Sequence, residues 1–210
     1  MIITVTMNPA IDKTIEIDVL LPGKLNRIQR VEYDAGSIPK GVDNGVYAEI
    51  IRIVHAKGAK VLMDADGELF RKALPASPDI IKPNRVELEE YAGIDYRTSD
   101  EELLGLARNL RNQGIETVAV SMGKSGAMLV REGYEVRCPA LSVKAHSTVG
   151  AGDAMVAALA YAEDNGLGNE ETMRLCMAAS AGAVTTIGTK PPTRELVDTL
   201  MEQVIINKLG

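Results

Sequence analysis

The sequence predicts an α/β fold in which a mostly parallel sheet carries helices on both faces. Short apolar segments with the β-branched residues of buried strands alternate along the chain with longer segments of helical spacing, and parallel strands require such a crossover between them. The 210 residues are 46% hydrophobic and 25% charged, which suits one soluble domain that buries a sizeable core.

The expected elements follow in order, with neither an internal repeat nor a linker between them. The N-terminal segment at 2–6 is β-branched and apolar, which predicts a buried strand. Alternating apolar and polar residues at 15–19 and 28–33 predict two half-exposed strands that can pair as a small antiparallel flap outside the main sheet. Further strands are expected at 60–64, 79–82, 116–121, 127–130 and 134–138, the last two as a hairpin, and helices at 46–57, 69–74, 84–91, 99–114, 154–161, 170–187 and 193–207.

Charge and composition argue against several classes of partner. Lys and Arg number 23 and Asp and Glu 29, so the formal net charge is −6, and no basic cluster offsets it; we therefore expect no nucleic-acid binding. The longest apolar run, at 154–162, is too short to cross a membrane, and the N-terminus lacks a signal-peptide pattern. Cys138 and Cys176 are not spaced as metal ligands and are expected to be buried free thiols, with one disulfide as the alternative. These features predict a cytoplasmic protein without a membrane partner.

The stretch from Ser147 to Asp153 is the first candidate for chemistry. Gly150 and Gly152 indicate a tight turn, and an Ala-rich apolar run follows, so a helix is expected to begin there. Unpaired amides and the helix dipole at such a start favour an anion, and Asp153 places a carboxylate beside it. A phosphate held over these amides next to a base is the minimum arrangement for phosphoryl transfer to an alcohol. The alternative is an ordinary helix start, since Asp in the first turn suits any helix.

Two further candidate stretches follow strands. Asn84 and Glu87 come after the strand at 79–82, at the sheet edge where open α/β folds bind ligands, and they suit the organisation of metal, water and phosphate. The same pair also fits a capping box, in which each side chain only stabilises the helix start. The loop at 121–126 offers two glycines and a lysine to a nucleotide phosphate, or is an ordinary turn into a hairpin.

Taken together and in this order, the three stretches resemble the PfkB/ribokinase family of carbohydrate kinases. The N-terminal sequence Asn-Pro-Ala-Ile-Asp and the later sequence Ser-Thr-Val-Gly-Ala-Gly-Asp resemble its branch of 1-phosphofructokinases and tagatose-6-phosphate kinases. The resemblance implies a ribokinase-like fold and transfer of the γ-phosphoryl group of ATP, with Mg²⁺ on the nucleotide phosphates, to a hydroxyl of a phosphosugar. That phosphosugar would be fructose 1-phosphate or tagatose 6-phosphate, and we expect the chain to form a homodimer.

The resemblance also assigns a role to each matching residue. Asp153 would deprotonate the acceptor hydroxyl, and the backbone donors of the turn before it would stabilise the charge that develops on the phosphoryl group. Asp12 matches the acceptor-sugar aspartate, and Glu87 would meet the magnesium indirectly, through water. The implied catalytic set is Gly150, Ala151, Gly152 and Asp153. The residues implied to bind the nucleotide are Asn84, Glu87, Ser121, Gly123, Lys124, Gly126, Thr148, Ala178 and Gly182.

The chain departs from the family pattern after Gly36. Family members continue there into Gly-Lys-Gly and an Asn, which begin a helix that grips the phosphosugar, whereas here residues 37–42 resemble a segment much further along a family chain. A block the size of a subdomain is thus absent, so the acceptor half and the flap are truncated. We expect one ribokinase-like domain over 1–210, with a flap remnant at 13–36 and a nucleotide-binding core at 37–210.

Two functions remain open from the sequence. The first is an ATP-dependent phosphosugar kinase with Asp153 as general base, whose activity the missing segment can impair. The alternative is a non-catalytic nucleotide-binding or assembly module derived from such a kinase. In either case nucleotide binding is expected to survive better than phosphosugar turnover. A dinucleotide-dependent oxidoreductase is disfavoured, because Met155 stands where the third glycine of that fingerprint belongs.

Overall fold

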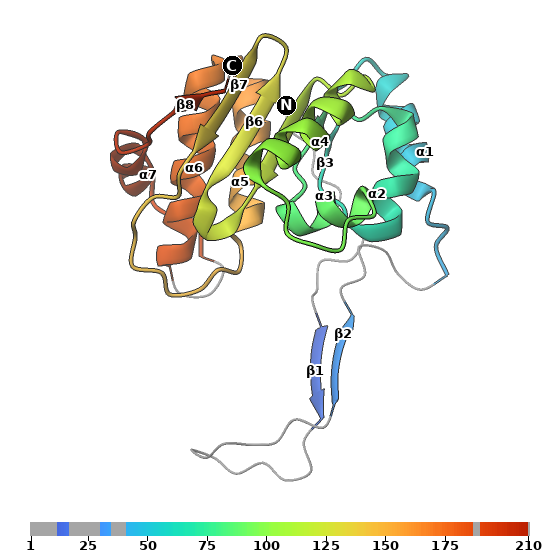
Figure 1. The fold of residues 1–210 in the computed structure, drawn as a ribbon, viewed down its shortest axis with the longest axis horizontal. Helices are drawn as coiled ribbons and strands as arrows, with labels where there is room; N and C mark the ends of the chain where they lie inside the picture. Colours follow the sequence, from blue (N-terminus) through green and yellow to red (C-terminus); the bar gives the residue numbers. More distant parts are fainter. Residues whose placement is uncertain (1–11, 17–29, 35–40, 187–189, 210) are drawn as a thin grey trace. The chain divides into compact units, whose positions relative to one another are not determined.

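The structure is a computed structural model that describes residues 12–16, 30–34, 41–186 and 190–209 of the 210-residue chain (Figure 1). Its Cα positions divide into two compact units. One unit is Ile3–Asn44, and the other is Met1–Ile2 with Gly45–Gly210. The strand predicted at 2–6 lies outside the described residues.

The small unit contains a two-stranded antiparallel sheet. Strand β1 is Asp12–Glu16 and strand β2 is Arg30–Asp34, with Asp12 opposite Asp34 at one end of the register and Glu16 opposite Arg30 at the other. The two strands form a sheet of their own, separate from the larger one. The predicted antiparallel pairing outside the main sheet is therefore confirmed for the described parts of these strands.

The large unit is built on a six-stranded sheet with the order β3-β4-β5-β6-β7-β8. Its strands are β3 Leu62–Met63, β4 Ile80–Ile81, β5 Thr117–Ser121, β6 Ala127–Arg131, β7 Tyr134–Cys138 and β8 Asn207–Lys208. The pairs β3-β4 and β4-β5 are parallel, whereas β5-β6, β6-β7 and β7-β8 are antiparallel. Within the described residues the sheet is thus mixed rather than mostly parallel. The connections after β5 and β6 are too short for the crossover that a parallel neighbour requires, so the strands that follow them run antiparallel.

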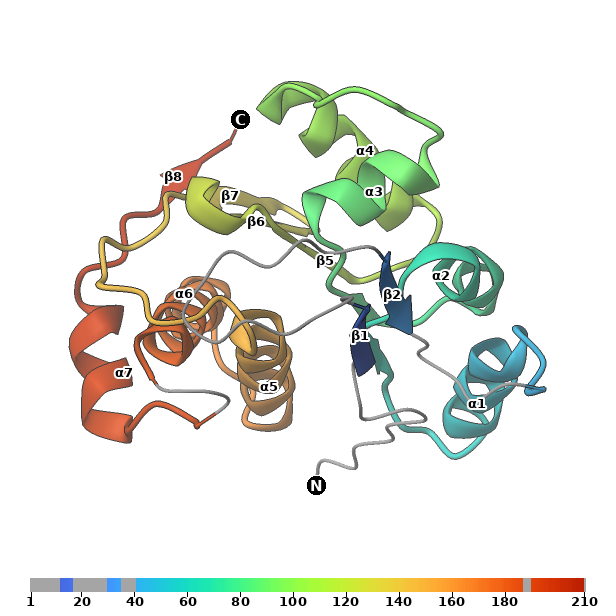
Figure 2. The same cartoon turned by 90° about the horizontal axis from the view of Figure 1, so that it is seen from below.

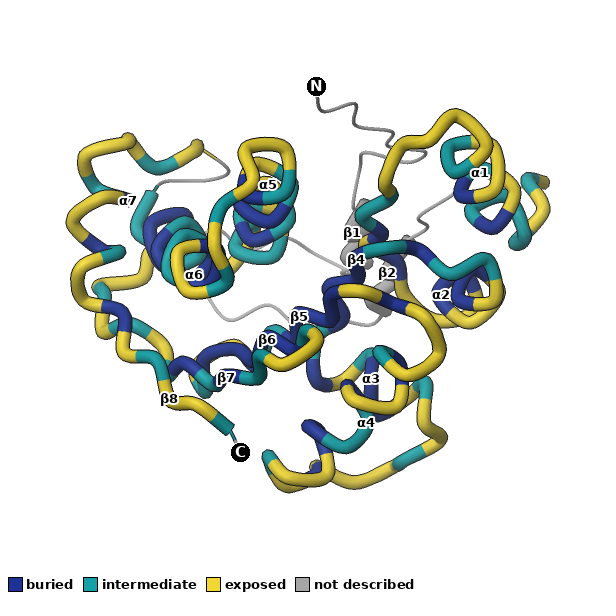
Figure 3. Tube along the Cα trace, turned by 90° about the horizontal axis from the view of Figure 1, so that it is seen from above, coloured by how far each residue is buried: buried dark blue, intermediate teal, exposed yellow. Residues whose placement is uncertain are grey.

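Helices cover both faces of this sheet, as predicted. They are α1 Val46–His55, α2 Gly67–Ala73, α3 Arg85–Tyr91, α4 Asp100–Asn112, α5 Ala151–Asp164, α6 Asn169–Thr185 and α7 Arg194–Met201, with short 3₁₀ turns at Leu74–Ala76 and Gly123–Ser125. Figure 2 shows α5 and α6 on one face of β5, β6 and β7, and α3 and α4 on the opposite face. Along the chain trace of Figure 3, the buried positions follow the strands and the sheet-facing sides of these helices.

The main core lies between the sheet and the helix pair α5 and α6. Leu129 and Val136 from the strands pack in one cluster with Leu159 from α5 and Met173 from α6, and each is at most 2% exposed. Burying side chains of this size contributes roughly 1.5–3 kcal/mol each to the free energy of unfolding. This packing fixes the start of α5 relative to the carboxyl ends of β3, β4 and β5.

One predicted helix is too long. The amphipathic segment at 193–207 is helical only to Met201, and Asn207 and Lys208 instead form β8, which pairs with β7. Val204 is 4% exposed and packs in the main core. Burial of Val204 turns the chain back to the sheet, and this tertiary contact overrides the local helical pattern.

Candidate active site

A cavity of about 600 Å³ lies in the large unit, and three segments line it. They are the β5–β6 loop (residues 122–126, with Ser121 before it), the segment at 140–155, which includes the start of α5, and one side of α6. The predicted residues that line this cavity are Ser121, Gly123, Lys124, Gly126, Thr148, Ala151 and Gly152. Two stretches that were predicted separately, the loop and the turn before α5, thus meet around one space.

The turn before α5 has the geometry of an anion-binding helix start. Gly150 is the N-cap residue, with φ +84 and ψ −6, a left-handed conformation that glycine adopts without strain. Ala154 donates its amide to the Gly150 carbonyl at 2.9 Å, so the intrahelical ladder begins there. The amides before Ala154 fall in the first turn, where a helix supplies no internal acceptor. These amides and the helix dipole favour a negatively charged group at this end of α5.

Lys82 adds a buried positive charge at the same place. It follows β4 and is only 5% exposed. Its Nζ lies 3.2 Å from Asp64 Oδ1, and a Cβ built on Gly152 would lie 3.5 Å from that Nζ. A lysine beside a helix N-terminus places like charges together, an arrangement that an anion between them stabilises. The sequence analysis missed Lys82, although its place at the carboxyl end of a strand, just before Asn84, was a usable signal.

Two carboxylates, Asp64 and Glu87, interact electrostatically with Lys82. Burial raises the pKa of the Asp64 carboxyl, and the charges on Asp153 and Asp66 act in the same direction, whereas Lys82 opposes them. Burial also raises the pKa of Glu87, against a hydrogen bond from the Asn84 amide and the charge of Lys82. Perturbed carboxyls grouped around one cation are typical of functional sites as well as of structural ion pairs.

Asn84 and Glu87 form the capping box that the sequence allowed as an alternative. The Glu87 amide donates to Asn84 Oδ1 at 3.0 Å, and the Asn84 amide donates to Glu87 Oε2 at 2.7 Å. Asn84 Nδ2 donates to the other Glu87 oxygen. The start of α3 also adjoins the cavity, because Asn84 forms a parallel bridge with Ser121, whose amide donates to the Pro83 carbonyl at 3.0 Å.

The described residues fit magnesium only as an indirect ligand set. No group of three or more His, Cys, Asp or Glu side chains that could hold a metal ion occurs in the described ranges. Both oxygens of Glu87 already accept hydrogen bonds from Asn84. Mg²⁺ usually keeps several waters and binds through one or two carboxylates together with substrate phosphates. These residues are compatible with a contact of Glu87 to Mg²⁺ through water, and that role stays a prediction.

The α6 wall of the cavity is formed by residues other than the predicted ones. Ala178 is fully buried in a cluster with α7, and a Cβ built on Gly182 would lie 2.8 Å from Pro192 Cβ. Neither residue lines the cavity, and the α6 residues that do are Met177, Ser180, Ala181 and Val184. The small residues of α6 are spread around its circumference, so the sequence pattern could not indicate which side faces the cavity.

Asp153 and Gly150 line a second hollow rather than the first. This hollow, of about 550 Å³, lies between α5, α6 and the segment at 190–197. Asp153 is exposed, on the first turn of α5. Residues of one turn thus line both hollows, with Ala151 and Gly152 at the first and Gly150 and Asp153 at the second. Asp12 begins β1 in the small unit, and its role in the site stays a prediction.

Comparison with solved structures identifies the fold. Phosphofructokinase-2 from Escherichia coli, solved in complex with potassium, is 27% identical with a TM-score of 0.74, and the match covers 79% of this chain and 54% of that one. Ribokinase from Arabidopsis thaliana, complexed with ribose and ATP, is 25% identical with a TM-score of 0.67, over 79% and 54% of the two chains. The predicted ribokinase-like α/β class is therefore confirmed.

Sequence comparison identifies the family. The family model of the pfkB family carbohydrate kinases matches residues 15–196. A 1-phosphofructokinase from Rhodobacter capsulatus is 41% identical over 174 residues, and one from Haemophilus influenzae is 37% identical over 175. The chain belongs to the pfkB family of carbohydrate kinases.

The matches also bear on chain length. They cover 83% of this chain but only 55% and 56% of the two relatives, so the chain spans about half their length. That coverage is consistent with the missing block predicted after Gly36.

In the part of the chain that the structure describes, no helix is long and apolar enough to cross a membrane.

Proposed function

We propose that this chain carries the nucleotide half of an ATP-dependent phosphosugar kinase of the 1-phosphofructokinase type. The observation that supports it most is the 600 Å³ cavity, which the β5–β6 loop and the start of α5 line together. Buried Lys82 beside Gly152 adds a cation where phosphates would lie. The other function left open by the sequence, a non-catalytic module, gains no support from the relatives, which are kinases by name.

The nucleotide would lie along the cavity with its two ends in different surroundings. Met177 and Val184 from α6 and Leu141 provide an apolar wall for the base. Lys124 and the first amides of α5 suit the phosphates at the other end. This division between an apolar and an anion-binding end is what a nucleotide requires.

Asp153 is the proposed general base. It takes the proton of the acceptor hydroxyl as that oxygen forms a bond to the γ-phosphorus, and the bond from the γ-phosphorus to the bridging oxygen breaks to release ADP. The backbone donors at the start of α5, together with Lys82, offset the charge on the phosphoryl oxygens. Mg²⁺, when bound with the nucleotide, neutralises the phosphate oxygens, and Glu87 would hold its water shell.

The acceptor and its surroundings follow from the relatives and remain part of the proposal. The phosphosugar would be fructose 1-phosphate or tagatose 6-phosphate, with Asp12 contacting it, and the protein would act as a cytoplasmic homodimer. Because the chain spans about half of its relatives, we expect nucleotide binding to persist where phosphosugar turnover is weak.

Two assays test this function. Calorimetric titration of MgATP into the folded chain should give saturable binding. An ADP-release assay with each phosphosugar should give activity that Asp153→Ala abolishes, while Asp164→Ala, at the other end of α5, leaves it unchanged. Equal ADP release from wild type and Asp153→Ala would rule out Asp153 as the base. Absence of ATP binding by the folded wild type would rule out the nucleotide site.

A further inference from the structure

Arg85 occupies a place in α3 that local helix energetics disfavour. It is the first helical residue, directly after Asn84, and its side chain is only 7% exposed. A positive charge at a helix N-terminus opposes the helix dipole, and burial of a guanidinium costs several kcal/mol unless acceptors surround it. An arginine in this position therefore calls for an explanation from its contacts.

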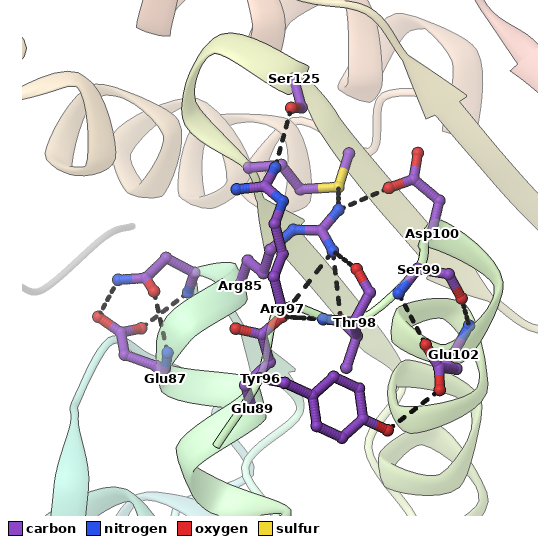
Figure 4. A network of polar contacts seen from close by, with 12 residues as sticks. Arg85, Glu87, Glu89, Tyr96, Arg97, Thr98, Ser99, Asp100, Glu102 and Ser125 are labelled. Carbon is purple, nitrogen blue, oxygen red and sulfur yellow. Dashed lines mark hydrogen bonds and ion pairs between the residues drawn. The ribbon is translucent and has the colours of Figure 1, made fainter. Parts of the chain in front are cut away.

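The contacts form a network (Figure 4), in which both terminal nitrogens of Arg85 have acceptors while its buried Nε has no hydrogen-bond partner among the described residues. Arg85 Nη1 donates to the Thr98 carbonyl at 2.6 Å and to Thr98 Oγ1 at 3.2 Å, and Nη2 donates to Asp100 Oδ1 at 2.5 Å. Glu89 Oε1 accepts from the amide and the hydroxyl of Thr98, both at 2.8 Å. Arg137 Nε donates to Asp100 Oδ2 at 2.6 Å, so two arginines face two carboxylates. Burial acts to raise the pKa of Asp100, but the hydrogen bonds from the two arginines outweigh it and hold that pKa below its ordinary value.

One contact of Arg85 reaches the β5–β6 loop, which lines the cavity. Arg85 Nη2 also donates to Met122 Sδ at 3.4 Å. Met122 is 7% exposed and anchors the β5–β6 loop, since its amide donates to the Gly126 carbonyl at 2.8 Å and its carbonyl accepts from the Ser125 amide at 3.1 Å. Arg85 thus lies between Asn84, its neighbour in the chain, and the residue on which the loop is built.

We propose that Arg85 is a positioning residue, which fixes the β5–β6 loop relative to the Asn84–Glu87 end of α3. Its consequence for nucleotide affinity rests on the function proposed above, whereas its effect on the loop does not. The planar fork of arginine is needed because one guanidinium serves Thr98, Asp100 and Met122 at once. Lysine keeps the charge but is a single point donor and cannot span these acceptors.

Arg85→Lys tests the proposal, with Arg131→Lys as the matched control. Arg131 is a half-buried arginine on β6 that donates to Thr117 Oγ1 at 2.9 Å and to Asn169 Oδ1 at 2.8 Å, and neither of these bonds reaches the β5–β6 loop. Hydrogen exchange should be at least fivefold faster at the loop amides of Met122, Ser125 and Gly126 in Arg85→Lys, and within twofold of wild type in Arg131→Lys. The dissociation constant for MgATP should rise at least fivefold in Arg85→Lys alone.

Each outcome decides one of the two proposals. Unchanged loop exchange in folded Arg85→Lys, or equal acceleration in Arg131→Lys, overturns the positioning role. Faster loop exchange in Arg85→Lys, together with a wild type that binds no MgATP, supports the positioning role and overturns the proposed function instead. If Arg85→Lys does not fold, Met122→Leu decides, because it removes the sulfur acceptor and nearly conserves volume. Loop exchange in Met122→Leu should then rise at least twofold, and an unchanged rate refutes the proposal.

Discussion

Gly152→Ala should raise stability and weaken nucleotide binding, two effects of opposite sign from one methyl group. The new Cβ would lie 3.5 Å from Lys82 Nζ, an ordinary van der Waals distance, so no clash is expected. Alanine is favoured over glycine within a helix and restricts the unfolded chain, which adds about 0.4–1 kcal/mol to the free energy of unfolding. The methyl, however, would stand between Lys82 and the amides of α5, where we place a phosphate.

Denaturant unfolding and calorimetry measure the two effects separately. We expect the midpoint of unfolding of Gly152→Ala to equal or exceed that of wild type, and its dissociation constant for MgATP to rise at least tenfold, which corresponds to about 1.4 kcal/mol. Gly105→Ala is the control, because Gly105 lies within α4 with nothing within 4 Å of its added Cβ. It should gain stability without a change in affinity. Wild-type affinity in Gly152→Ala would refute the placement of a phosphate at this turn.

Three further predictions follow from other parts of the large unit. Asp100→Asn should lower the melting temperature at neutral pH. Because folding lowers the pKa of Asp100, the difference in melting temperature between variant and wild type should persist at pH values above 3.8, the ordinary pKa, and shrink at lower pH. A difference in melting temperature that stays constant with pH would contradict this. Gly126→Ala should lower the free energy of unfolding, measured with denaturant, by about 2 kcal/mol or more. Gly126 has φ +97, and an added Cβ would lie 1.9 Å from the Cys138 carbonyl oxygen. Near-wild-type stability would contradict this and show that the loop can shift. Burial raises the pKa of the Cys138 thiol to about 11 and that of Cys176 to about 12, so neither should react with a thiol reagent until the chain unfolds, and rapid labelling of the folded protein would contradict their burial.

The parts of the fold that the sequence predicted well are those with local signals. Asn84 and Ser99, each followed three residues later by Glu, begin helices with capping boxes, at the helix starts that the sequence predicted. The hairpin of β6 and β7 and the helix after Gly150 also lie where turn residues and apolar runs placed them. The buried, free state of both cysteines was predicted from their spacing and is confirmed. The capping, turn and apolar-run signals act over a few residues, so no tertiary information was needed for them.

The parts that the sequence could not predict depend on contacts between distant segments. The helix expected to run to 207 ends at Met201 because Val204 is buried in the core and β8 finds a partner in β7. The side of α6 that faces the cavity depends on where Pro192 packs, against Gly182. The place of Lys82 after a strand was a usable local signal, but its closeness to Gly152 became visible only in the fold. For the candidate site, the sequence therefore indicated which loops meet but not every side chain that they expose.

Calorimetric titration of MgATP into wild type and Lys82→Met tests the central claim most directly. A charged hydrogen bond to phosphate contributes roughly 1.5–3 kcal/mol, so its loss corresponds to a tenfold or larger increase in the dissociation constant. The account predicts saturable binding of MgATP by wild type and at least tenfold weaker binding by folded Lys82→Met. No binding by the folded wild type, or equal affinities in the two proteins, would contradict it.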